Sequence, residues 1–284
     1  MRALSGELFK TVRRPAVWVC VIGLMAAAVT IGYALPWVIE TFTKNAQGLP
    51  PGTTLADFKV ALYPQNFVRQ TLQQWSTLGG VFALIVGVLL QGSEYGWGTV
   101  KMLYTQRDGR LAMLLGKVSA MAVVVLILAA GLFAVSAAAS GAAAILDGKS
   151  LDYPDAAIIA KGVGAMYLIF GFWALFGFVL ATLFRQSAMA IGLGLAYALV
   201  IEVIIFTVIG SLGGDWVKQI QQWFPLANTG YLASSFGRVS LRGLETGGVA
   251  PYRDATHAVS VLLTYLVAFV LICSALLRRR DVTS

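Results

Sequence analysis

No charged residue interrupts the 29-residue stretch from Val118 to Leu146, which reads VSAMAVVVLILAAGLFAVSAAASGAAAIL. A helix needs roughly 20 mostly apolar residues to cross the hydrocarbon core of a bilayer, so this stretch is longer than one span requires. Two spans would need a turn between them, but the stretch contains no Pro, Asn or Asp. We therefore predict one long, tilted helix over about 112–146, with Lys117 near its start.

The composition of the whole chain is typical of a membrane protein. Of its 284 residues, 58% are hydrophobic and 12% are charged, whereas soluble domains carry about 25% charged residues. Five further apolar runs predict spans at about 17–39, 73–92, 161–184, 188–212 and 257–277. The first run is too long for a cleavable signal peptide, so we expect it to remain as a helix. The fold class that follows is all-α integral membrane, a single transmembrane domain over residues 1–284 with six transmembrane helices.

Basic residues are distributed unequally between the two sides of these spans. The side with both termini carries twelve basic and four acidic residues, whereas the other side carries nine basic and eight acidic residues. The twelve are Arg2, Lys10, Arg13, Arg14, Lys101, Arg107, Arg110, Lys117, Arg185, Arg278, Arg279 and Arg280. Because Lys and Arg near span ends concentrate in the cytoplasm, we predict that both termini are cytoplasmic.

The same inventory excludes several classes of function. The net charge of +8 is explained by orientation, so it does not indicate nucleic-acid binding. Cys20 and Cys273 lie in apolar runs and His257 is the single histidine, which leaves no metal-ligand spacing. Gly148-Lys149-Ser150 resembles the end of a phosphate-binding loop, but Ala143 stands where its first glycine is required. We expect no catalytic residue, no metal or cofactor and no ATPase site on this chain.

Residues 1–16 carry an amphipathic pattern. Leu4, Leu8 and Val12 recur every four residues, which gives a helix an apolar stripe. The charged residues fall elsewhere on that helix, at Glu7, Lys10, Arg13 and Arg14. Such a helix suits the headgroup plane of a membrane. The alternative is a charged run-in to the first span.

The stretch from Gln91 to Arg110 connects the second and third spans. Three glycines near its start permit sharp backbone bends. Thr99–Gln106 then predicts a short helix with Val100, Leu103 and Tyr104 on one face. A short amphipathic helix of this kind can dock into the groove of a partner. The alternative is a loop that lies against the bilayer.

The segment Asp215–Tyr231, on the opposite side, carries an aromatic stripe at helical spacing. The stripe consists of Trp216, Ile220, Trp223 and Phe224. Tryptophan and its aromatic neighbours favour membrane interfaces, so we predict a helix that dips into the outer leaflet and ends at Pro225. We expect its role to be structural.

Three groups of residues together resemble a known family. They are Glu94-Tyr95-x-Trp97-Gly98-Thr99 followed by Gly109-Arg110, the pair Gly116-Lys117, and the amino-terminal Glu7-x-x-Lys10-x-x-Arg13-Arg14-Pro15. The chain is similar in these motifs to type-2 ATP-binding-cassette (ABC) transporter permeases. The resemblance implies a connecting helix at residues 1–16, with Glu7, Lys10, Arg13 and Arg14, and a cytoplasmic coupling helix between spans two and three. It assigns contact with the ATPase to Glu94, Tyr95, Trp97, Gly98, Thr99, Leu103, Arg107, Gly109 and Arg110.

The resemblance also implies partners and an activity. Such a permease works with two copies of a cytoplasmic ABC ATPase, which carry ATP and Mg, and with a second permease as a homodimer or paralogous heterodimer. It resides in a bacterial plasma membrane and exports a drug, antibiotic, peptide or lipid-like substrate. Residues 213–257 would correspond to re-entrant external helices between spans five and six.

Four residues within spans are candidates for the dimer contact and the substrate path. Gly79, Ala83 and Gly87 repeat every four residues, so they predict either a dimer seam or close packing within one chain. Glu202 is the acid deep in a span, where it would line a path for cationic substrates or make hydrogen bonds in the packing. The aromatic residues of the fourth span are expected mostly to meet lipid; they are Tyr167, Phe170, Phe172, Trp173 and Phe176.

Two other classes of function remain as alternatives. An ion-coupled secondary transporter would be expected to carry more intramembrane carboxylates and broken helices at matching positions of two halves, and neither is visible in the sequence. A membrane anchor or sensor that works with an ATPase without transporting anything would share the same topology. A soluble ATPase encoded in a neighbouring reading frame would favour the exporter subunit, or the anchor or sensor that works with an ATPase, over the ion-coupled transporter.

Overall fold

Six helices in the described part of the computed structural model are long and apolar enough to cross a membrane. They are Pro15–Ile39, Pro64–Ser93, Leu111–Leu146, Ala156–Phe184, Ser187–Val208 and Ala255–Leu277. The structure describes residues 2–42, 55–96, 110–211, 215–237, 240–241, 244–245 and 254–279. The six apolar runs predicted from sequence coincide with these helices, so the protein is an α-helical, multi-pass membrane protein.

The chain begins with the short helix α1 (Arg2–Val12), followed by the first span. That span comprises α2 (Pro15–Val29), a π-helical segment (Thr30–Ala34) and α3 (Leu35–Phe42). After α4 (Leu55–Leu62) and a 3-10 turn (Pro64–Asn66) come the long helices α5 (Phe67–Gly96), α7 (Arg110–Leu146) and α8 (Ala156–Phe184). The long apolar run is thus a single helix, as its lack of turn residues predicts.

The second half of the chain is more interrupted. The fifth span comprises α9 (Ser187–Ala196), a second π-helical segment (Tyr197–Ile201) and α10 (Glu202–Ser211). The helices α11 (Asp215–Gln221) and α12 (Pro225–Ser234) follow, then the two-residue antiparallel strands β1 (Ser240–Leu241) and β2 (Leu244–Glu245), then α13 (Ala255–Arg279). Proline opens α12, where its missing N–H is tolerated.

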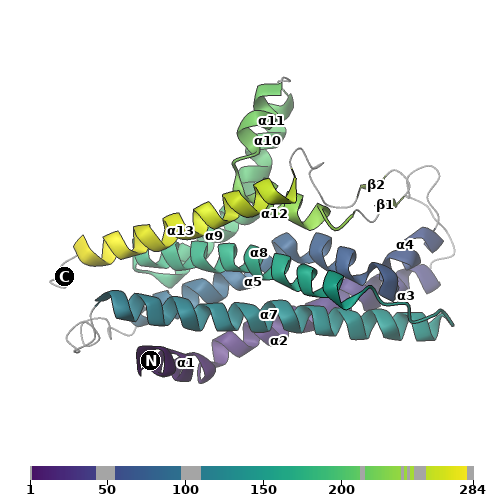
Figure 1. Ribbon diagram of the computed structural model, residues 1–284, viewed down its shortest axis with the longest axis horizontal. Helices are drawn as coiled ribbons and strands as arrows, with labels where there is room; N and C mark the ends of the chain where they lie inside the picture. Colours follow the sequence, from purple (N-terminus) through teal and green to yellow (C-terminus); the bar gives the residue numbers. More distant parts are fainter. Residues whose placement is uncertain are drawn as a thin grey trace.

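The long helices pack as a bundle. Figure 1 shows α5, α7, α8 and α13 running alongside one another, while α10 and α11 project away from them. Both chain termini lie at the same end of the bundle (Figure 1). The starts of α5 and α8 lie toward the opposite end, which we call the far end (Figure 1).

The centre of the bundle is the pair α5 and α8. Phe170, Phe172 and Trp173 of α8 are all fully buried, and Trp75 of α5 is 1% exposed. The prediction that the aromatic residues of the fourth span mostly meet lipid is therefore wrong; within that group Tyr167 is the exposed member. The reason is position, because α8 contacts α5, α7, α9 and α13.

The two π-helical segments were not predicted, and each has a local consequence. In the first span, Pro36 has no N–H to donate to the carbonyl of Gly32, and the wide turn just before it accommodates that loss. In the fifth span, the i→i+5 turn stacks residues five apart, which brings the Tyr197 hydroxyl within 2.9 Å of the Glu202 carboxylate.

Candidate functional site

The helix α1 lies against α7 at the end of the bundle that holds both termini. Its inner side carries Glu7 and Thr11, which are 9% and 2% exposed. Thr11 Oγ1 donates to the backbone oxygen of Glu7 at 2.7 Å, and Lys10 Nζ lies 2.7 Å from the Glu7 carboxylate. Phe9 and Val12 are more than half exposed. Glu7 and Thr11 thus face the protein, whereas Phe9 and Val12 are on the exposed side of α1, where they can contact lipid.

Arg14 joins the start of the first span to the end of α5. Its Nη1 donates to the backbone oxygens of Leu89 at 3.0 Å and Leu90 at 3.3 Å. Ser93 Oγ donates to the same Leu89 oxygen at 2.6 Å. The neighbouring Arg13 instead lies over the Phe9 ring, 4.2 Å from its centroid, and is exposed. One of two adjacent arginines therefore connects two helices, while the other covers the surface of α1.

A buried lysine joins α5 to α7 at the same end. Lys117 is 7% exposed, and its Nζ donates to Gln91 Oε1 at 2.9 Å. In the sequence, Lys117 lies near the start of the predicted third span and belongs to the Gly116-Lys117 motif. In the structure it is a polar link whose cost of burial is offset by hydrogen bonding.

The predicted coupling residues lie partly outside the described residues. Glu94 and Tyr95 are in the last turn of α5, and Arg110 opens α7. The other six, namely Trp97, Gly98, Thr99, Leu103, Arg107 and Gly109, fall outside the described residues, as does the predicted helix Thr99–Gln106. Gly92 does not bend the chain as expected: α5 continues through it, and a Cβ there would clash with Ser187.

The described ends of α5 and α7 are therefore fixed to each other and to α1. We call the hydrogen bonds of Arg14 to Leu89 and Leu90 and of Lys117 to Gln91, together with the packing of α1 on α7, the amino-terminal frame. It holds the two helix ends that flank residues 97–109. Sequence reasoning identified Arg14 by its motif but had no means of locating its carbonyl acceptors.

Glu202 caps a neighbouring helix. The residue is 2% exposed, and its carboxylate accepts hydrogen bonds from the backbone N–H groups of Leu226 and Ala227, both at 3.1 Å, and from Tyr197. Leu226 and Ala227 are in the first turn of α12, whose N–H groups have no partner within the helix. The geometry matches the hydrogen-bonded alternative for Glu202, and its place on a substrate path stays a prediction.

The glycine face of the second span packs within the chain. A Cβ on Gly79 would lie 2.6 Å from Cζ of Phe170, one on Gly87 would overlap the carbonyl oxygen of Ala174, and Ala83 is fully buried. The close approach is reciprocal, because a Cβ on Gly177 of α8 would overlap a backbone oxygen of α5. This face contacts α8, which matches the alternative of close packing within one chain, while the dimer seam stays a prediction.

A polar cluster at the far end was missed by sequence reasoning. Asp147, just after α7, accepts hydrogen bonds from Trp37 Nε1 at 3.3 Å, Tyr63 at 3.2 Å and Lys59 at 3.5 Å. It thereby joins α3, α4 and α7. A signal was present, since Asp147 is the acid that ends the longest apolar run and precedes Gly148 in a left-handed conformation (φ 64°).

The fold and these polar contacts define a multi-pass α-helical membrane protein whose helices are joined by charged side chains at both ends. A protein-family model described as "Protein of unknown function (DUF2705)" matches residues 63–283. The chain belongs to this family, and the match covers five of its six candidate spans. No curated protein matches the chain.

Proposed function

We propose that this protein is the permease subunit of an ABC exporter in a bacterial plasma membrane. It forms the translocation path with a second permease and is driven by two copies of a separate cytoplasmic ATPase. Support comes from the six apolar helices, from termini at one end of the bundle, and from the motifs that resemble type-2 permeases. The basic excess of that end favours its cytoplasmic placement.

The amino-terminal frame is the observation that carries the proposal. An ATPase can move a permease only if the contacted segment is mechanically connected to the spans. The expected coupling stretch is flanked by α5 and α7. Lys117 joins these two helices, Arg14 joins α5 to the junction between α1 and α2, and α1 packs on α7. Displacement of the coupling stretch would therefore move three helices together. Hydrogen bonds to charged groups are suited to this because they are directional and strong.

The substrate class follows from the resemblance alone. We propose efflux of a drug, antibiotic, peptide or lipid-like molecule. Glu202 does not enter this proposal, because its carboxylate is engaged by α12. The chain would supply no chemistry of its own, and ATP hydrolysis would occur on the partner.

The test is reconstitution with an ATPase encoded in a neighbouring reading frame. The two proteins are co-expressed, purified together and placed in nanodiscs, and ATP hydrolysis is measured with and without candidate substrates. Substitution of Tyr95 and Trp97 by Ala should abolish co-purification. If association is unaffected by these changes, or if no ATPase associates with the unaltered chain, the proposal fails.

A matched pair of arginine variants tests the frame itself. Arg14→Ala removes the hydrogen bonds to α5, which are worth about 1.5–3 kcal/mol each when charged, so substrate-stimulated hydrolysis should fall about tenfold. Arg13→Ala removes an equal charge from the exposed side of α1 and should leave hydrolysis within about twofold of the unaltered complex. If the two variants reduced hydrolysis equally, the positive charge, and not the hydrogen bonds between Arg14 and α5, would account for the effect.

A further inference from the structure

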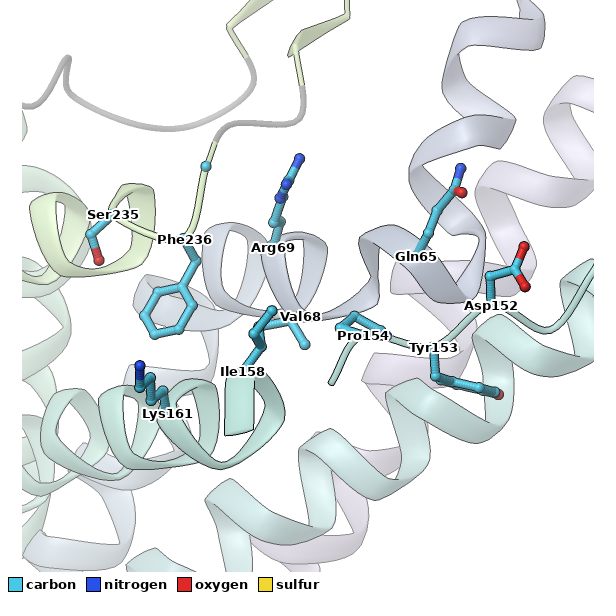
Figure 2. A pocket seen from close by; sticks show the side chains of 11 residues that line it. Gln65, Val68, Arg69, Asp152, Tyr153, Pro154, Ile158, Lys161, Ser235 and Phe236 are labelled. Atoms are coloured by element: carbon cyan, nitrogen blue, oxygen red, sulfur yellow. The ribbon is translucent and has the colours of Figure 1, made fainter. Parts of the chain in front are cut away.

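A pocket of about 640 Å³ is lined by residues from the starts of α5 and α8, and these helix starts lie at the far end of the bundle (Figure 1). It is bounded by the start of α5, the loop that leads into α8 with the first turns of α8, and the segment that follows α12. Figure 2 shows its lining side chains. Small-molecule sites in proteins have volumes of about 300–1,000 Å³, so the pocket is large enough for a ligand headgroup.

Two cations lie in this pocket without a partner among the described residues. Arg69 comes from α5 and Lys161 from α8, and neither has a hydrogen bond or ion pair to any part of the chain that the structure describes. Asp152 also lines the pocket but accepts a hydrogen bond from the Ser150 hydroxyl. The charged lining residues are two cations and one carboxylate, so the formal charge of the lining is positive.

The position of Arg69 is built into the fold. Gly237 has a φ of 93°, which favours glycine, and a Cβ there would lie 3.0 Å from Arg69 Nε. Gln73, one turn further along α5, donates from Nε2 to the Gly237 oxygen at 2.7 Å. The segment after α12 is thus held against α5 and leaves space for the guanidinium.

The helix ends add to the positive potential. Both α5, with 30 residues, and α8, with 29 residues, begin at the pocket. The start of a helix carries a partial positive charge from its aligned peptide dipoles. Asp155 precedes α8 but does not line the pocket.

The rest of the lining combines the polar side chains of Gln65, Tyr153 and Ser235 with an apolar group that reaches the surface of the bundle. Val68, Pro154, Ile158 and Phe236 line the pocket, and Phe236 lies between Arg69 and Lys161 in Figure 2. Ile158 is 43% exposed, so apolar surface reaches the rim. A ligand that fits these walls has an anionic group and an adjoining apolar part.

We propose that this pocket binds the phosphate headgroup of an anionic membrane lipid, with Arg69 and Lys161 as the anion-binding pair. The planar guanidinium can bind two phosphate oxygens at once, while the lysine ammonium acts as a point charge. The apolar walls contact the adjoining glycerol and acyl carbons. The proposal does not depend on the exporter function, because it concerns the chain without any ATPase.

The experiment measures lipid binding to the purified full-length chain. The protein in detergent is titrated with dioleoylphosphatidylglycerol, and bound lipid is counted by native mass spectrometry. Arg69→Gln and Lys161→Gln should each weaken binding about tenfold, the effect of losing one charged contact. Lys218→Gln is the matched control, since Lys218 is an exposed cation on α11 that does not line the pocket, and it should change binding less than about twofold.

Two further measurements complete the test. Arg69→Lys keeps the charge and should recover part of the affinity, and an unchanged melting temperature in all variants shows that the fold is intact. Glycerol 3-phosphate, which has the headgroup phosphate without acyl chains, should compete at least about tenfold more weakly than the lipid. Equal competition by glycerol 3-phosphate would overturn the lipid as the ligand. Binding that is unaffected by both pocket substitutions, or reduced equally by Lys218→Gln, would overturn the site.

Discussion

The second and fourth spans differ from the fifth and sixth in how they are packed. In α5 and in α8, 61% of the most apolar window is buried within the chain, compared with 22% in the fifth span and in α13. The two exposed spans are the more apolar ones. Burial in this protein therefore does not follow apolarity. In lipid, apolar side chains gain nothing by leaving the solvent, so close packing depends on small residues and complementary shape.

The largest expected effect comes from filling the seam between the two buried spans. Gly87→Ala would place a methyl group against the carbonyl oxygen of Ala174, so we expect a loss of about 3 kcal/mol in stability. Gly171→Ala on α8 is the matched control, because a Cβ there meets nothing within 4 Å. Melting in detergent, followed by size-exclusion chromatography, measures both. If the two variants melt alike, the seam is not the source of the close packing.

An intermediate effect is expected where the exposed fifth span is attached to the rest of the protein. Glu202→Ala leaves two N–H groups of α12 without their acceptor, which should cost about 2 kcal/mol. Glu202→Gln keeps one carbonyl oxygen and should cost about half as much. Hydrogen exchange of a peptide that covers Leu226 and Ala227 should accelerate most in the alanine variant. Unchanged exchange in that variant would contradict the capping role.

The smallest effect is expected on the outer face of the fifth span. Ile204 is 55% exposed, so Ile204→Ala should change stability by less than about 0.5 kcal/mol. Ile169 of α8 is fully buried and serves as the reference, and Ile169→Ala should cost at least about 2 kcal/mol. The free energy of unfolding of each variant is measured in detergent, and its molar mass is measured by light scattering. A cost at Ile204 as large as that at Ile169, with a fall in mass, would show that α10 is buried against a second chain.

The boundaries of the second span illustrate what apolar runs predict and what they miss. The run predicts a start near residue 73, but the helix begins earlier, with the turn Pro64–Asn66 and α5 from Phe67. Polar residues such as Arg69 and Gln73 lower the local hydropathy of this turn. Val68 and Leu72, on the other side of the same turn, are nevertheless buried. Hydropathy averaged over a window of residues cannot distinguish the buried side of a helix from its exposed side.

For the candidate site, too, the sequence identifies residues of interest but does not predict their contacts. The motifs single out Arg13 and Arg14 equally, and nothing in the sequence separates their roles. The helix α1 ends at Val12 and α2 begins at Pro15, so the two arginines lie in the break and point to different neighbours. Glu202 was recognised as unusual because an acid in a span requires a partner. Its partner is 24 residues away, and only the fold brings the two together.

The sequence by itself determined the class of this protein. Long uncharged runs can be stable only in lipid as helices, because every backbone polar group must then be satisfied within the segment. The tertiary structure decided the rest: that the glycines at 79 and 87 receive α8, that the aromatic side chains of α8 are central, and that Arg69 and Lys161 meet at one pocket. Lipid and protein interior are equally apolar, so hydropathy carries no information about which helix faces which.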